Sequence, residues 1–227
     1  MKKNEWSASL ICANFETLKD DLQILKEFDV SYLHIDIMDG IFVPRFGMYP
    51  EMVKKIKNWS SIPIEVHLMI QNPENYIETF IQAGADLLTV HVEIGLSNLS
   101  RILEKSTTGG AKAGLALNPE TDFGQFEHIQ DLFNYLLVMG VDPGTVGQKI
   151  KTFIPKKINK YKTLLSPSKK IILDGGVSLI NFQDLFTAGA DILVGGSQTI
   201  FKDSDDLSEN LSKIALKQNN SQLHSSL

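Results

Sequence analysis

Two short stretches of the sequence place histidines among alternating apolar residues. One reads His-Ile-Asp-Ile-Met-Asp-Gly at 34–40, and the other reads Ile-Glu-Val-His-Leu-Met at 64–69. Side chains of a β-strand alternate between two faces, so each stretch would direct its polar residues to one side. The residues on these faces are His34, Asp36 and Met38 in the first stretch and Glu65, His67 and Met69 in the second. Together they predict a metal pocket, whereas either histidine alone would indicate a buried core residue with satisfied hydrogen bonds.

A further candidate ligand is Asp174, which follows the short apolar segment 171–173. The complete candidate set is His34, Asp36, His67 and Asp174. These nitrogen and oxygen donors suit zinc, iron, manganese or cobalt better than calcium or magnesium. We therefore expect one divalent metal ion, with zinc or iron ahead of manganese or cobalt. Taken alone, Asp174 could equally cap a helix or lie in a turn, because two glycines follow it.

The two aspartates of this set indicate proton-transfer chemistry. Two carboxylates balance the charge of one divalent ion if both histidines are neutral. Asp36 and Asp174, approaching one bound carbon from opposite faces, can exchange the roles of base and acid, which inverts that centre. A metal ion beside them would act as a Lewis acid and stabilise the substrate anion.

Glycine-rich segments follow the last two expected strands and predict an anion site. They are Gly175-Gly176 and Gly195-Gly196-Ser197, and the segment 142–148 follows an earlier strand. Paired glycines let backbone N–H groups approach a phosphate closely. Each pair alone is consistent with ordinary turn chemistry, but two pairs on adjacent loops favour the phosphate interpretation.

Short apolar segments alternate with segments of helical period along the chain, which predicts strands and helices in alternation. The expected strands are 7–13, 32–38, 64–69, 87–92, 111–117, 135–139, 171–173 and 192–194. The expected helices are 15–28, 51–58, 73–84, 98–105, 121–133, 154–165, 180–188 and 207–216. Eight such units predict a (β/α)8 TIM barrel, with its working face at the carboxyl ends of the strands.

An open doubly wound sheet is the alternative fold, and the sequence disfavours it because no Gly-x-Gly-x-x-Gly follows the first strand. We expect a single barrel domain over 1–217 and a disordered polar tail over 218–227. Ser9 and Met139 also come at expected strand ends. The barrel therefore predicts that both lie at the working face.

The composition is typical of a soluble globular protein, with 43% hydrophobic and 22% charged residues among 227. No apolar run approaches the roughly 20 residues that cross a membrane. The net charge of -5 disfavours nucleic acid but is compatible with an anionic substrate. One cysteine, Cys12, excludes an internal disulfide and is expected to fill space in the first strand. With no signal peptide recognised, we expect a cytoplasmic protein. We also expect the protein to form a homo-oligomer.

The ordered motifs of the chain resemble those of the ribulose-phosphate 3-epimerase family. The matching motifs are Ser-Leu-Ile-Cys-Ala-Asn-Phe at 9–15, the 34–40 stretch, Phe-Val-Pro at 42–44, His-Leu-Met at 67–69, Asn-Pro at 118–119, Pro-Gly at 143–144, Gly-Gln at 147–148, Asp-Gly-Gly at 174–176 and Gly-Ser at 196–197. The resemblance covers 7–201 and implies a TIM-barrel isomerase that acts on a small phosphorylated ketose.

The resemblance also implies roles for individual residues. Asp36 and Asp174 would be the acid/base pair, and both would hold the metal together with His34 and His67. The implied substrate-binding residues are Ser9, Met38, His67, Met69, Met139, Gly144, Gly147, Gly175, Gly176, Gly196 and Ser197. Among these, the methionines would form a dry cap over the metal and an enediolate, and the glycines and Ser197 would contact the phosphate.

Three departures from the family pattern, at four positions, concern the substrate. Arg45 stands where asparagine is usual, and a cation there could bind an extra anionic group or narrow the entrance. Asp142 resembles the allulose 6-phosphate 3-epimerase branch rather than the pentulose branch. Thr145 and Val146 replace a phenylalanine and a small residue in the loop near the substrate.

The expected reaction is the interconversion of D-ribulose 5-phosphate and D-xylulose 5-phosphate, a step of pentose phosphate metabolism. Because of Asp142, a hexulose 6-phosphate 3-epimerase is the alternative within this class. From another class, the chain could be a barrel that binds a sugar phosphate without turnover, with Arg45 obstructing the site. The sequence alone leaves these alternatives open.

Overall fold

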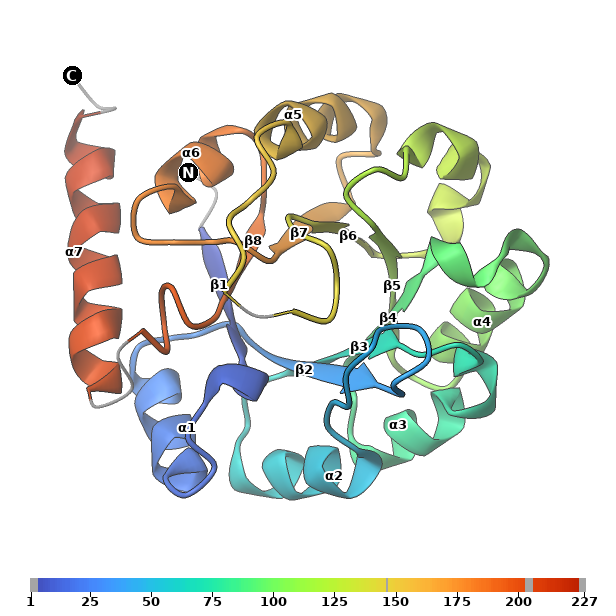
Figure 1. Ribbon diagram of the computed structural model, residues 1–227, viewed down its shortest axis with the longest axis horizontal. Coiled ribbons are helices and arrows are strands. Elements are labelled where there is room, and N and C mark those ends of the chain that lie inside the picture. Colours follow the sequence, from blue (N-terminus) through green and yellow to red (C-terminus); the bar gives the residue numbers. More distant parts are fainter. Residues whose placement is uncertain (1–3, 146, 203–205, 225–227) are drawn as a thin grey trace.

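Parallel β-strands pair side by side in chain order and close into a barrel (Figure 1). The computed structural model describes residues 4–145, 147–202 and 206–224. Within these ranges the strands are β1 Glu5–Ser9, β2 Tyr32–Met38, β3 Ile64–Met69, β4 Leu87–His91, β5 Lys112–Leu117, β6 Tyr135–Met139, β7 Lys170–Asp174 and β8 Ile192–Gly195. Pairing of β1 with both β2 and β8 closes the sheet, which confirms the expected (β/α)8 barrel.

Helices surround the barrel and cover the outer face of its strands (Figure 1). The α-helices are α1 Leu18–Glu27, α2 Pro50–Trp59, α3 Ile77–Ala83, α4 Leu96–Thr108, α5 Ile154–Leu164, α6 Phe182–Thr187 and α7 Leu207–His224. Short 3-10 segments are η1 Leu10–Cys12, η2 Pro73–Asn75, η3 Val92–Ile94 and η4 Phe123–Leu132. None of the described helices is both long and apolar enough to span a bilayer.

Alternation along the strands separates two hydrophobic layers. On β2, Leu33 and Ile35 are fully buried and belong to the large core between the barrel and its helices. Inside the barrel, a smaller cluster that includes Leu137 and Ile172 fills the space between the strands. The polar members of β2 point inward, because strand periodicity turns them away from the helices. This placement brings His34 and Asp36 to the interior of the barrel.

Several element boundaries differ from those expected. The first strand ends at Ser9 rather than at 13, because the chain turns into η1, whose end is closed by a hydrogen bond from Ala13 N–H to Leu10 O. The helix expected over 15–28 begins only at Leu18. The segment 121–133 forms the 3-10 helix η4 rather than an α-helix.

The last helix is longer than the sequence indicated. It was expected to end at 216 and to be followed by a disordered tail from 218, but α7 continues to His224. The added segment contains glutamine, asparagine and serine but neither glycine nor proline, so nothing in it breaks the helix. Residues 225–227 lie outside the described residues, and the division into a domain over 1–217 and a tail stays a prediction.

Candidate metal centre and substrate pocket

Four side chains converge inside the carboxyl end of the barrel. One donor atom from each of His34, Asp36, His67 and Asp174 lies within 4.8 Å of the other three. His34 Nε2 lies 3.0 Å from Asp36 Oδ1 and 3.5 Å from Asp174 Oδ2. His67 Nδ1 lies 3.2 Å from Asp36 Oδ1 and 3.7 Å from Asp174 Oδ2. All four predicted ligands therefore face one point.

Strand register brings these residues together. Asp36 on β2 pairs in register with His67 on β3, so their side chains leave the sheet side by side. Asp174 is the last residue of β7, where it pairs in register with Met139 at the end of β6. Both histidines are fully buried, while the side chains of Asp36 and Asp174 are 10% and 14% exposed. The two carboxylates therefore form the accessible side of the cluster.

The electrostatics of the cluster favour a cation. Burial lowers the pKa of His34, but the carboxylates of Asp36, Glu65 and Asp174 raise that pKa well above its ordinary value. Burial raises the pKa of Asp36, but His34 and His67 lower it well below the usual range. The carboxylates thus hold positive charge among them. Nitrogen and oxygen donors that face one point fit a divalent transition metal ion, as the sequence predicted.

A buried carboxylate orients the first histidine. Glu65 Oε2 lies 2.9 Å from His34 Nδ1, the ring nitrogen that faces away from the cluster. Thr89 Oγ1 donates to Glu65 Oε1 at 2.9 Å, so both carboxylate oxygens have a partner. Because an ionised carboxylate can only accept, His34 Nδ1 donates to Glu65, which leaves Nε2 as the ring nitrogen that would ligate a metal ion. Outer partners of this kind commonly orient metal-ligating histidines.

A longer chain of contacts orients the second histidine. His67 Nε2 lies 2.9 Å from His91 Nε2, and His91 Nδ1 lies 3.0 Å from Glu93 Oε2. The other oxygen of Glu93, Oε1, accepts from Asn118 N–H at 2.9 Å and from Thr121 Oγ1 at 2.5 Å. The four-residue cluster is therefore connected, through His91 and Glu93, to the loop after β5.

The two residues that connect His67 to the loop after β5, His91 and Glu93, both have shifted pKa values. Burial lowers the pKa of His91, and Glu93 offsets that change only in part. Burial raises the pKa of Glu93, but hydrogen bonds from His91, Thr121 and Asn118 lower it below the ordinary value. A neutral ring thus faces an ionised carboxylate.

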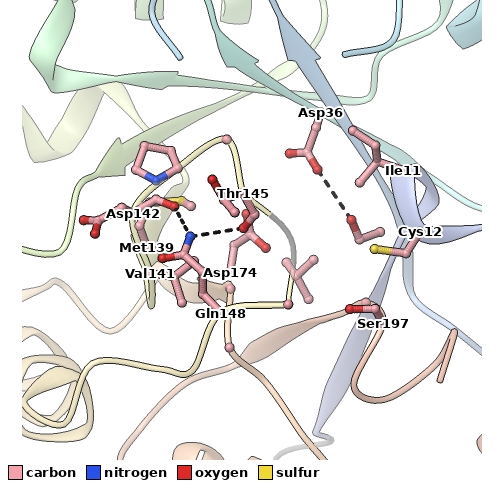
Figure 2. Close-up of a pocket in the computed structure, with 18 of the residues that line it drawn as sticks. Ile11, Cys12, Asp36, Met139, Val141, Asp142, Thr145, Gln148, Asp174 and Ser197 are labelled. Carbon is pink, nitrogen blue, oxygen red and sulfur yellow. Dashed lines mark hydrogen bonds between the residues drawn. The ribbon is translucent and has the colours of Figure 1, made fainter. Parts of the chain in front are cut away.

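A pocket opens above the cluster (Figure 2). Asp36 and Asp174 line this pocket, whereas His34 and His67 do not and lie beneath it. The other sequence-predicted site residues all line it, and they are Ser9, Met38, Arg45, Met69, Met139, Asp142, Gly144, Thr145, Gly147, Gly175, Gly176, Gly196 and Ser197. Cys12 also lines the pocket, from η1 rather than from the first strand, and burial raises the pKa of its thiol.

The loop after β6 packs against the loops after β2 and β7 beside this pocket. The loop after β6, yellow in Figure 1, carries Gly144, and a Cβ atom there would lie 2.7 Å from Val43 Cβ of the loop after β2. Gly176, after β7, has a φ of +72°, and a Cβ atom on it would lie 2.5 Å from Ile150 N. Backbone approaches this close require glycine. They leave the loops after β6 and β7 packed against each other beside the cluster.

The residues that depart from the family pattern have different surroundings. Asp142 Oδ1 forms an ion pair with Lys151 Nζ at 2.9 Å, and its backbone oxygen accepts from Gln148 Nε2 at 2.8 Å. Thr145 O accepts from the same amide at 3.1 Å, as Figure 2 shows. Arg45 lines the pocket, and no ion pair is recorded for it among the described residues. Val146 lies outside the described residues.

The sequence analysis assigned no role to Glu65, His91 or Glu93. One residue separates His91 from Glu93 at the end of the strand expected over 87–92, just as one residue separates His34 from Asp36, and this signal was available in the sequence. Glu65 shares the strand face of His67, which was a second signal. Gln148, whose side chain ties the loop after β6 to itself, was part of a quoted motif but was given no role.

The chain is similar to known proteins over most of its length. The model of the Ribulose-phosphate 3 epimerase family matches residues 5–201. Ribulose-phosphate 3-epimerase of Bacillus subtilis is 36% identical over 87% of this chain and 92% of its own, and that of Methanocaldococcus jannaschii is 35% identical over 86% and 84%. The chloroplastic ribulose-5-phosphate-3-epimerase of Arabidopsis thaliana is 35% identical over 84% of this chain and 69% of its own.

Among solved structures, a tryptophan synthase α-subunit of Pyrococcus furiosus superposes with a TM-score of 0.70 over 94% of this chain and 98% of its own. At 17% identity this likeness shows the fold alone. The sequence relatives are carbohydrate-phosphate epimerases, which are isomerases. The family match spans the barrel from β1 to β8 and includes all four residues of the cluster. The chain therefore belongs to the ribulose-phosphate 3-epimerase family.

Proposed function

We propose that this protein is a metal-dependent 3-epimerase that interconverts D-ribulose 5-phosphate and D-xylulose 5-phosphate. The observation that carries the proposal is that Asp36 and Asp174, from β2 and β7, present carboxylates to one point at the floor of a pocket. The names of the sequence relatives support the substrate. Glycine-bearing loops after β6, β7 and β8 border the same pocket and suit a phosphate group.

In this reaction one aspartate removes the proton from C3 and the other returns a proton to the opposite face. Asp36 is held for this task by the two histidines and by Ser9, whose Oγ lies 3.5 Å from Asp36 Oδ2. His34, Asp36, His67 and Asp174 would hold one divalent metal ion, with zinc or iron ahead of manganese or cobalt. The ion would supply Lewis acidity, which stabilises negative charge on an enediolate.

The remaining pocket residues would bind the substrate and exclude water. Met38 and Met69 are each at most 6% exposed, pack together with Val43, and would form a dry cap with Met139. Gly144, Gly147, Gly175, Gly176, Gly196 and Ser197 would surround the phosphate through backbone N–H groups and the serine hydroxyl. His67 and Ser9 would contact the sugar from below and from the β1 side.

A hexulose 6-phosphate is the second candidate substrate, and Asp142 at the pocket wall is the observation that favours it. The ion pair of Asp142 with Lys151 reduces its free negative charge, which favours neither sugar. The candidate from another class is a sugar-phosphate-binding barrel without turnover. It is motivated by Arg45, whose side chain lines the pocket and could obstruct the entrance.

Epimerisation in heavy water tests the reaction and separates these candidates. The purified, metal-loaded protein is incubated with ribulose 5-phosphate, xylulose 5-phosphate or allulose 6-phosphate, and the product is analysed by NMR. We expect one solvent deuteron at C3 of the epimerised pentulose phosphate, with kcat/KM highest for that pair. A higher kcat/KM for the hexulose would replace the proposed substrate. Absence of deuterium at C3 of all three sugars would favour the binding protein.

Three further expectations stay proposals. We propose that the protein forms a homo-oligomer, which analytical ultracentrifugation of the full chain would detect as a mass above 25.3 kDa. We propose a cytoplasmic location, which fractionation of the native cells would test. The single-domain division at 217 predicts that a chain ending there unfolds in one cooperative transition with near-native stability.

A further inference from the structure

The second histidine of the cluster has an outer partner unlike that of the first. His34 meets a carboxylate directly through Glu65, whereas His67 meets a second histidine ring, His91, which in turn meets Glu93. Two ring nitrogens at 2.9 Å must share one proton, because a contact of two bare nitrogens or of two N–H groups would be repulsive. The direction of that hydrogen bond decides which nitrogen of His67 faces the cluster without a proton.

The direction follows from the far end of the chain. Glu93 Oε1 is fixed as an acceptor by Asn118 N–H, and Oε2 faces His91 Nδ1 at 3.0 Å. An ionised carboxylate has no proton to give, so His91 Nδ1 must donate. A neutral His91 then has a bare Nε2, which accepts the proton of His67 Nε2. When a metal ion takes the place of the proton that the 3.2 Å contact with Asp36 Oδ1 otherwise requires, His67 Nδ1 is the bare nitrogen that ligates it.

We propose that Glu93, acting through His91, sets the tautomer of His67 and thereby prepares its Nδ1 to ligate the metal ion. This inference rests on the metal centre of the proposed function and assigns roles to two residues beyond it. Neither His91 nor Glu93 is within the four-residue cluster, so both are positioning residues rather than ligands or proton-transfer groups.

The substitution Glu93→Gln reverses the direction of the hydrogen bonds that link residue 93, His91 and His67, while the side chain keeps its shape. Asn118 N–H still requires an acceptor at the Oε1 position, so the amide oxygen takes that place and the amide NH2 group faces His91 Nδ1. His91 must then accept at Nδ1 and donate at Nε2. His67 must accept at Nε2 and carry its proton on Nδ1, where it opposes metal binding.

Metal affinity measures this effect directly. Zinc-free protein is titrated with Co²⁺ and with Zn²⁺ against a chromogenic chelator, and the visible absorption of the Co²⁺ form is recorded. We expect Glu93→Gln to weaken both metals about 10- to 100-fold, the usual effect of an outer-shell substitution. We also expect the Co²⁺ absorption of the variant to change. Thermal unfolding of the zinc-free forms should give similar melting temperatures, because the exchange is isosteric.

Two matched variants separate this role from a structural one. Thr121→Val removes a donor to Glu93 Oε1 but keeps the carboxylate, and Glu120→Gln neutralises a nearby carboxylate that pairs with Lys151. Both should retain wild-type metal affinity. Equal weakening by Thr121→Val would assign the effect to anchoring of the loop after β5 and overturn the proposal.

Nitrogen NMR of the wild-type protein provides a test that needs no variant. In the zinc-loaded protein the ring proton of His91 should reside on Nδ1, and in Glu93→Gln it should reside on Nε2. A wild-type His91 protonated on Nε2 would overturn the inference, as would wild-type metal affinity in Glu93→Gln. Failure of the wild-type protein itself to bind Co²⁺ or Zn²⁺ would instead contradict the metal centre of the proposed function.

Discussion

Asp174 Oδ2 lies 3.5 Å from Nε2 of His34, although the two residues come from β7 and β2, which do not pair in the barrel. Barrel closure through β8 and β1 brings these strands to the same interior space. Asp174, on β7, thereby joins one cluster with His34, Asp36 and His67, which lie on β2 and β3.

Asp174→Asn should lower kcat about 10²- to 10⁴-fold, the usual contribution of a general acid or base. The amide keeps the shape of the side chain and one donor oxygen, so metal and phosphate binding should be retained in part. Steady-state kinetics and metal titration would measure the two effects separately. Asp184→Asn, at an exposed position of α6, is the control and should behave as the wild type. Near-wild-type turnover in Asp174→Asn would exclude the two-aspartate mechanism.

Removal of the metal ion should lower both activity and stability. A ligand that binds only the folded protein stabilises it by about 2.7 kcal/mol at 100 times its dissociation constant. Without the ion, the carboxylates of Asp36 and Asp174 also lose their charge compensation. Thermal unfolding with and without a chelator measures the loss. Re-addition of Zn²⁺, Fe²⁺, Mn²⁺ or Co²⁺ to separate samples identifies the metal. Unchanged melting temperature and full activity in chelator would contradict the metal centre.

Gly176→Ala should disturb the loop beside the proposed phosphate site. Its φ of +72° and the 2.5 Å approach of a Cβ atom to Ile150 N leave no room for a side chain. We expect a destabilisation of about 1–3 kcal/mol and a higher KM for the sugar phosphate. Gly124→Ala is the matched control, because its Cβ atom would meet only Asp122 Oδ1 at 3.8 Å. Denaturant unfolding and kinetics should therefore separate the two variants.

Arg45→Asn tests whether the guanidinium at the pocket mouth assists binding of an anionic substrate. An exposed charge contributes about 0.2–1 kcal/mol, so KM should rise by up to about fivefold with kcat unchanged. The rise should shrink at high salt, because salt screens exposed charges. Kinetics at two ionic strengths would measure this, with Lys19→Asn on the outside of α1 as the control. A lower KM in Arg45→Asn would instead indicate that the arginine obstructs the entrance.

The sequence was sufficient for the barrel and for its ligand cluster. The strands over 32–38, 64–69 and 135–139 were predicted to the residue, because strict alternation and flanking loop residues define them clearly. The same alternation places His34 and Asp36 on one face. Since the working face of a barrel is known in advance, distant strand ends such as that of Asp174 could be brought together without coordinates.

Other features depended on contacts that periodicity does not encode. The apolar run after Ser9 gave no sign that the chain would leave the sheet and form η1. The hydrogen-bonded chain from His67 to Glu93 depends on ring nitrogens at specific distances, which register alone does not determine. The ion pair of Asp142 with Lys151 depends on how the loop after β6 folds back. Each of these features is set by tertiary packing rather than by local pattern.

The four clustered residues His34, Asp36, His67 and Asp174 all reside on strands, whereas Arg45, Asp142 and Thr145 belong to connecting segments. Segments of this kind tolerate replacement far better than the strands they join. A redesign that transplants those segments from a relative with another sugar preference can thus redirect selectivity while the reaction centre is inherited intact.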